Sequence, residues 1–142
     1  MEKQLVTIPG FEGGLSGRVF SPALRIGPWL LVSGVVAFDF AAGRSVGRAE
    51  GTPTQPGKVD PEAQWRQALT NLKGLVEAAG GSMRDVVKAN VFVTDIAYYY
   101  DYEWVRKEFF EPPYPVSTAM EVARLVHPDW VLEIEASAYI GD

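Results

Sequence analysis

The strongest pattern in the sequence is an amphipathic helix that leads directly into an alternating strand. Asp60 and Pro61 begin the helix, because aspartate is a favoured N-cap and proline suits the first helical position. Apolar residues then recur at helical spacing until the pair Gly80-Gly81 ends the pattern. These residues are Trp65, Ala68, Leu69, Leu72, Leu75, Val76 and Ala79. After a turn over residues 82–85, alternation predicts a strand with Val87, Ala89, Val91 and Val93 on one face.

The remaining periodic segments predict a sheet that the helices cover on one side. Residues 19–35 form two apolar runs divided by Gly27-Pro28, which predicts a hairpin. Residues 95–110 return to a helical pattern, and residues 117–123 and 131–140 read as strands. The order ββαβαββ predicts an α+β domain, a mixed sheet with two helices packed on one face.

The length of 142 residues suits a single domain that spans the whole chain, 1–142. Residues 1–17 precede the first predicted strand and form an N-terminal extension. Residues 39–60 are rich in glycine, proline, threonine and alanine, which predicts a long loop. Loops of this length in compact domains are often functional or mobile.

The charge balance and the composition argue against several classes of function. The chain has 13 lysines and arginines against 18 acidic residues, a net charge of −5, so we expect no nucleic-acid partner. It contains no cysteine, which excludes thiol catalysis and thiolate metal sites, and its single histidine, His127, cannot form a histidine-rich metal site. The segment GTPTQPGK (residues 51–58) has the wrong glycine spacing for a phosphate loop. We therefore predict no cofactor and no metal.

No apolar run approaches the length needed to cross a membrane, and the first residues, MEKQLVTIPGFEGG, lack the apolar core of a signal peptide. We therefore expect a cytoplasmic protein with no membrane partner.

Two glutamates share one face of the last predicted strand. In the segment VLEIEASAYI, Glu133 and Glu135 alternate with the apolar residues of the other face, Leu132, Ile134, Ala136 and Ala138. The simpler interpretation is a sheet face turned to solvent. The functional interpretation is that one carboxylate lies in a cleft, has a raised pKa, and positions or deprotonates a water molecule. The spacing alone favours the interpretation of a sheet face turned to solvent.

Several motifs together resemble one known family, the Rid/YjgF reactive intermediate deaminases, over residues 19–139. The longest is QALTNLKGLVEAAGGSMRDVVKANVFVTD at residues 67–95. The others are LLVSG (30–34), EFF (108–110), PYP (113–115), EVARL (121–125) and LEIEASA (132–138). The resemblance implies a chorismate-mutase-like fold and a homotrimer with a barrel-like core and intersubunit ligand clefts. It also implies hydrolysis of imines and enamines such as 2-aminoacrylate to 2-oxo acids and ammonia.

The resemblance assigns roles to three positions that match the family pattern. Glu133 falls on the glutamate that positions the water, which makes it the first candidate for catalysis. Gly34 matches the glycine that lets the backbone approach the ligand. Ala119 falls on a position whose backbone carbonyl helps to hold the water, a role that any side chain permits.

Other positions depart from the family pattern where the substrate is expected. Ser117 stands where the family has an arginine that binds the substrate carboxylate, Phe20 replaces a tyrosine, and Glu103 replaces an asparagine. Arg18 or Arg106 is a candidate for a relocated cation. These changes predict a substrate that is less anionic or more apolar than 2-aminoacrylate, because a serine does not pair with a carboxylate as an arginine does.

Three functions remain open from the sequence. The first is a diverged enzyme that hydrolyses a small imine, enamine or related carbonyl compound in an intersubunit cleft. The second is a homotrimer that binds a small molecule without catalysis. The third is the ribonuclease or translation-inhibitor activity attached to parts of this family, against which the acidic charge balance argues.

Overall fold

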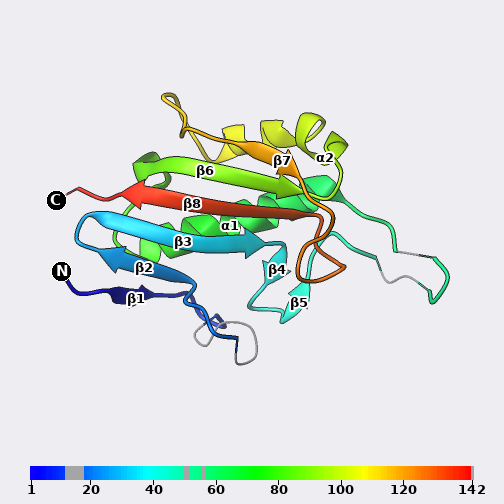
Figure 1. Cartoon of the computed structure of the whole chain (residues 1–142), viewed down its shortest axis with the longest axis horizontal. Coiled ribbons are helices and arrows are strands. Elements are labelled where there is room, and N and C mark those ends of the chain that lie inside the picture. The colour runs from blue at the N-terminus through cyan, green and yellow to red at the C-terminus, as the bar shows by residue number, and fades with distance from the viewer. Residues whose placement is uncertain (12–17, 50–51, 56, 142) are drawn as a thin grey trace.

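The computed structural model describes residues 1–11, 18–49, 52–55 and 57–141. Its main feature is a six-stranded sheet in the order β1-β2-β3-β8-β6-β7 (Figure 1). The strands are β1 (Gln4–Val6), β2 (Ala23–Ile26), β3 (Trp29–Val36), β6 (Val86–Val93), β7 (Ala119–Glu121) and β8 (Leu132–Tyr139). Strands β6 and β7 are parallel and the other neighbours are antiparallel. The predicted mixed sheet is therefore confirmed.

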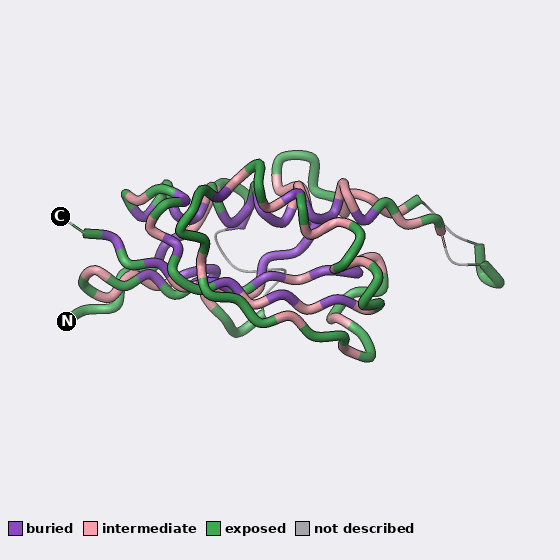
Figure 2. The backbone as a smooth tube through the Cα atoms, turned by 90° about the horizontal axis from the view of Figure 1, so that it is seen from above, coloured by how far each residue is buried: buried purple, intermediate pink, exposed green. Residues whose placement is uncertain are grey.

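The helices cover one face of this sheet, as the sequence predicts, and no described helix lies on the other face (Figure 2). They are α1 (Pro61–Ala78), η1 (Met83–Asp85), α2 (Ala97–Tyr100) and η2 (Glu103–Glu108). A separate two-stranded ribbon, β4 (Phe38–Asp39) and β5 (Arg44–Ser45), begins one residue before the predicted long loop, 39–60, and otherwise lies within it. None of the helices in the described part of the chain is long and apolar enough to cross a membrane.

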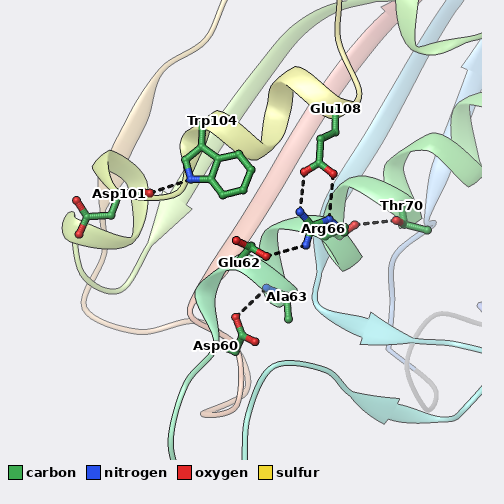
Figure 3. Close-up of polar contacts among 8 residues, drawn as sticks. All are labelled: Asp60, Glu62, Ala63, Arg66, Thr70, Asp101, Trp104 and Glu108. Atoms are coloured by element: carbon green, nitrogen blue, oxygen red, sulfur yellow. Dashed lines mark hydrogen bonds and ion pairs between the residues drawn. The ribbon is translucent and has the colours of Figure 1, made fainter.

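Helix α1 forms where its capping and periodicity predict. The side chain of Asp60 accepts a hydrogen bond from the amide of Ala63 at 3.1 Å (Figure 3). The apolar stripe is fully buried against the sheet, with Trp65 and Leu69 both 0% exposed. On the outer side, Arg66 pairs with Glu108 at 2.6 Å and so links α1 to η2 (Figure 3).

The single helix predicted over residues 95–110 is wrong, because the segment divides into α2 and η2. In a continuous helix the carbonyl of Tyr98 would accept from the amide of Tyr102. The carbonyl of Tyr98 instead accepts a hydrogen bond from the indole nitrogen of Trp65 at 2.8 Å. The amide of Tyr102 donates to the carbonyl of Tyr99 at 3.3 Å. A tertiary contact from α1 therefore interrupts the helix.

The prediction that Val87 lies on the buried face of β6 is wrong. The register with β8 shifts between Val86 and Lys88, so Val86 is buried and Val87 is 40% exposed. The later residues Ala89, Val91 and Val93 are buried as predicted. Strand β1, which no sequence pattern predicted, pairs with β2 at the edge of the sheet. It lies in the predicted N-terminal extension, 1–17, of which residues 12–17 are outside the described part of the chain.

Candidate functional site

The alternation predicted for β8 is confirmed, and it places two carboxylates on the face away from the helices. Leu132 and Ile134 are buried in the core, whereas Glu133 is half-buried and Glu135 is exposed. Glu135 accepts a hydrogen bond from Asn90 on β6 at 3.2 Å. Glu135 therefore faces solvent, as the simpler interpretation of the strand pattern predicts, whereas the side chain of Glu133 is partly shielded from solvent.

Glu133 packs directly against the backbone of Gly34. The pairing of β3 with β8 shifts between Val32 and Val35, and Gly34 lies within this irregularity. A Cβ atom on Gly34 would lie 2.6 Å from the carboxyl carbon of Glu133 and 2.9 Å from Oε1. Residue 34 therefore has to lack a side chain if the carboxylate is to stay where it is.

A cavity of about 290 Å³ surrounds this carboxylate, and we call it the Glu133 cavity. It brings together four of the predicted site residues: Glu133, Gly34, Phe20 and Arg18. The rest of its lining is mostly apolar: Phe11, Ser33, Val36, Phe40, Val126 and Trp130. Burial in this lining, with a smaller contribution from the neighbouring charge of Glu135, raises the pKa of Glu133 above its ordinary value.

Aromatic residues from distant segments build the walls of the Glu133 cavity. The rings of Phe11 and Phe40 lie 4.2 Å apart between centroids, and Phe11 meets Phe20 edge-on at 6.3 Å. Trp130 donates from its indole nitrogen to the hydroxyl of Ser45 at 3.0 Å. Phe40 and Ser45 belong to the region 39–60, so this region contributes to the site. No short motif contains Phe11, Phe40 or Trp130, so the sequence did not predict them as site residues.

The segment that carries Trp130 is held by a buried glutamine of α1. Gln64 is 0% exposed. Its amide nitrogen donates to the carbonyl of Asp129 at 2.7 Å, and its amide oxygen accepts from the backbone of Val131 at 2.9 Å. Gln64 therefore fixes the start of β8, immediately before Glu133.

Two other predicted site residues, Ser117 and Glu103, line a second cavity of about 250 Å³. We call it the Arg106 cavity, because the guanidinium of Arg106 connects the two. Its other lining residues are Ala89, Trp104, Lys107, Phe110, Tyr114 and Pro115. Nη1 of Arg106 donates to the hydroxyl of Ser117 at 3.1 Å, and Nη2 donates to the carboxylate of Glu103 at 2.5 Å.

Within one chain the two cavities lie on opposite sides of the sheet. Glu133 points away from the helices, whereas the guanidinium of Arg106 lies over the ring of Trp65 on α1, 5.8 Å from its centroid. Ala119 lies on β7 opposite Val91, half-buried against the core. The predicted site residues therefore form two groups in the isolated chain. No group of three metal-ligating side chains occurs in the described ranges.

The comparison with known proteins agrees with this architecture. A family model described as "Endoribonuclease L-PSP" matches residues 16–140. The chain belongs to the Rid/YjgF family. A relative from Dermatophagoides farinae, named 2-iminobutanoate/2-iminopropanoate deaminase, is 34% identical over 106 residues, which cover 75% of this chain and 74% of that protein.

Solved structures of family members have the same fold. The structure of RidA from the Antarctic bacterium Psychrobacter sp. PAMC 21119 matches with a TM-score of 0.79 and 31% identity, covering 96% of this chain and 99% of that one. The structure of Escherichia coli TdcF with bound serine matches with a TM-score of 0.80 and 28% identity, covering 98% and 100%. The predicted α+β family fold is therefore confirmed.

Proposed function

We propose that this protein hydrolyses a small imine or enamine to a carbonyl compound and ammonia, with Glu133 handling the water. The observation that carries the proposal is the position of Glu133, whose carboxylate lies against Gly34 in an apolar cavity with a raised pKa. A carboxyl group with a raised pKa is a stronger base than an ordinary glutamate once it is ionised. The name of the Dermatophagoides farinae relative, an imine deaminase, supports the same reaction class.

The reaction that we propose needs only a base that later returns its proton. Glu133 accepts a proton from water as the water oxygen bonds to the carbon of the protonated imine, and the C=N π electrons move to the nitrogen, which gives a neutral carbinolamine. Protonated Glu133 returns this proton to the carbinolamine nitrogen. The ionised carboxylate then accepts the hydroxyl proton as the oxygen forms the C=O bond and the C–N bond breaks, and that proton finally passes to the departing ammonia, which leaves as ammonium. An enamine enters this sequence after it has been protonated at carbon to give the imine.

We further propose that the cleft forms between copies of the chain in a homotrimer. The Glu133 cavity and the Arg106 cavity lie on opposite sides of one sheet, so a small ligand touches both only if a second copy supplies one of them. The sheet face away from the helices also carries large apolar side chains, among them Leu31, which is 47% exposed, and the edge-on pair of Trp29 and Tyr139. Association of these faces would bury the exposed apolar area.

The proposal is tested by generating 2-iminopropanoate in situ, with an amino-acid oxidase acting on alanine, and following imine decay with and without the protein. We expect the protein to accelerate hydrolysis. Saturable binding of the oxo-acid product with no acceleration would instead support the alternative, a homotrimer that binds a small ligand without catalysis.

A further inference from the structure

We propose that the Glu133 cavity selects substrates whose imine carbon carries a substituent with an aromatic ring, in preference to a methyl substituent. This inference rests on the proposed function, in which Glu133 activates water in this cavity, and it specifies one part of the substrate, the substituent. The carboxylate of Glu133 and several aromatic side chains line the same cavity. A substituent on the carbon that reacts beside Glu133 therefore has these rings as neighbours.

The Glu133 cavity is large enough for an aromatic ring. Apolar cavities of about 150 Å³ in protein interiors hold benzene. The Glu133 cavity has a volume of about 290 Å³. A ring and the reacting carbon therefore fit into it together, whereas a methyl substituent leaves most of the volume unfilled. The smaller group forgoes the apolar burial and the dispersion contacts that a ring would gain.

Four aromatic rings line the Glu133 cavity, those of Phe11, Phe20, Phe40 and Trp130. Phe11 and Trp130 are buried, yet neither belongs to the hydrophobic core that the sheet forms with α1. They are buried around the cavity instead. Aromatic rings pack favourably against other rings in offset and edge-on arrangements, so a lining of this kind favours a ring in the ligand.

Phe40 is held in the turn between β4 and β5. The carboxylate of Asp39 accepts hydrogen bonds from the amides of Ala41 and Ala42 at 2.9 and 3.1 Å. A Cβ atom on Gly10 would lie 2.8 Å from the carbonyl oxygen of Phe40, so the N-terminal segment packs closely against this turn. A wall that is ordered before the ligand arrives loses little conformational freedom on binding, which favours affinity.

The polar side chains of the lining offer little to a polar substituent. The hydroxyl of Ser33 donates to a backbone carbonyl at 2.6 Å, and the indole nitrogen of Trp130 donates to Ser45. Among the described residues that line the cavity, only Arg18 and Glu133 carry a charge. A polar group placed among the rings would lose its hydrogen bonds to water without replacement.

The aromatic wall is a feature of this chain. Phe11, Phe40 and Trp130 lie outside the motifs that carry the family resemblance. Phe11 also precedes the residues that the family model matches, 16–140. The preference for an aromatic substituent therefore follows from residues that the family pattern does not specify, and it agrees with the sequence-based expectation of a more apolar substrate.

The test compares two imines that differ only in this substituent. An amino-acid oxidase generates 2-imino-3-phenylpropanoate from phenylalanine and 2-iminopropanoate from alanine, and the decay of each imine with the protein gives kcat/KM. We expect a value about tenfold or more higher for the imine with the phenyl ring, since a single methylene in an apolar pocket already changes kcat/KM by about tenfold. An equal or lower value for the phenyl-bearing imine would overturn the inference.

Variants of the cavity wall test whether the rings cause the preference. Phe40→Ser removes one ring and should lower the ratio of the two kcat/KM values by about fivefold or more. Tyr100→Ser is the matched control, because Tyr100 is an aromatic residue 74% exposed on α2, and it should leave the ratio unchanged. An unchanged ratio in Phe40→Ser would also overturn the inference. If Phe40→Ser fails to fold, Phe20→Ser, at a ring 43% exposed, carries the same comparison.

An equilibrium titration with phenylpyruvate and pyruvate, the products of the two probe reactions, measures the same preference without turnover. Tighter binding of phenylpyruvate that is weakened in Phe40→Ser supports the inference. If this preference is found but neither imine is hydrolysed faster, the proposed function fails and the selectivity of the cavity stands. Accelerated hydrolysis of both imines with equal kcat/KM would defeat this inference alone.

Discussion

A Cβ atom on Gly34 would lie 2.6 Å from the carboxyl carbon of Glu133 and 2.8 Å from its Cγ. Distances this short cannot be accommodated unless the glutamate side chain moves. The Glu133 carboxylate on β8 can therefore keep its position only because residue 34 on β3 has no side chain. If Glu133 handles the water, the geometry of the reaction depends on Gly34.

Gly34→Ala should impair activity more than stability. The added methyl group displaces the Glu133 carboxylate, and a misplaced catalytic group lowers the rate by about 10- to 100-fold. The measurement is kcat/KM for imine hydrolysis together with thermal unfolding. Gly141→Ala is the control, because a Cβ there has no atom within 4 Å. Full activity in Gly34→Ala would show that the position of Glu133 does not matter.

Protonation of Glu133 should make stability depend on pH in a defined direction. Its pKa is raised in the folded protein, so the folded state binds the proton more tightly than the unfolded chain does. The associated stability is present below the ordinary glutamate pKa of about 4.3 and is lost as the pH rises through the raised value.

Glu133→Gln removes this dependence and is the corresponding test. The variant should be more stable than the wild type at neutral pH, and its advantage should shrink towards about pH 4, near the ordinary glutamate pKa. Urea unfolding at a series of pH values measures the difference. A difference that stays constant with pH would contradict the assignment.

The sequence predicts those parts of the fold that local patterns determine. Asp60, Pro61 and the apolar stripe define α1 almost to the residue, and alternation assigns the two faces of β8. The break between α2 and η2 is not predictable in this way, because it depends on the indole of Trp65 binding the carbonyl of Tyr98. The register shift that exposes Val87 likewise depends on the partner strand.

The candidate site, like the fold, was predictable only in part from the sequence. The resemblance identifies Glu133, Gly34 and Phe20, and the structure brings them into one cavity. The walls formed by Phe11, Phe40 and Trp130 come from segments that only folding brings together. The contact of Arg106 with Ser117 depends on where η2 lies, which the sequence mispredicts as part of one continuous helix.

Gln64→Leu should destabilise the protein and loosen the segment before Glu133. The change leaves the amide of Val131 and the carbonyl of Asp129 without the partner they have now. Each buried polar group left unpaired costs about 1–3 kcal/mol. Urea unfolding at fixed protein concentration measures the loss, with the exposed residue 55, Gln55→Leu, as the control. Equal stability of the two variants would show that the Gln64 bonds are dispensable.

Leu31→Asp should prevent the assembly that we propose. Leu31 is 47% exposed on the sheet face without helices, and an aspartate there would place an uncompensated charge in the interface. Sedimentation velocity should show a trimer for the wild type and smaller species for the variant. Tyr100→Asp, at a residue 74% exposed on α2 in the helical layer, should remain a trimer. A wild-type monomer would remove the intersubunit cleft.

The comparison of Glu133→Gln with Glu135→Gln in imine hydrolysis tests the central claim most directly. Both residues lie on the same face of β8, and only Glu133 lies in the apolar cavity against Gly34. We expect Glu133→Gln to lower kcat by about 10²- to 10⁴-fold, the usual contribution of a general base, and Glu135→Gln to stay within about twofold of the wild type. Wild-type turnover in Glu133→Gln would contradict the assignment of Glu133 as the residue that handles the water.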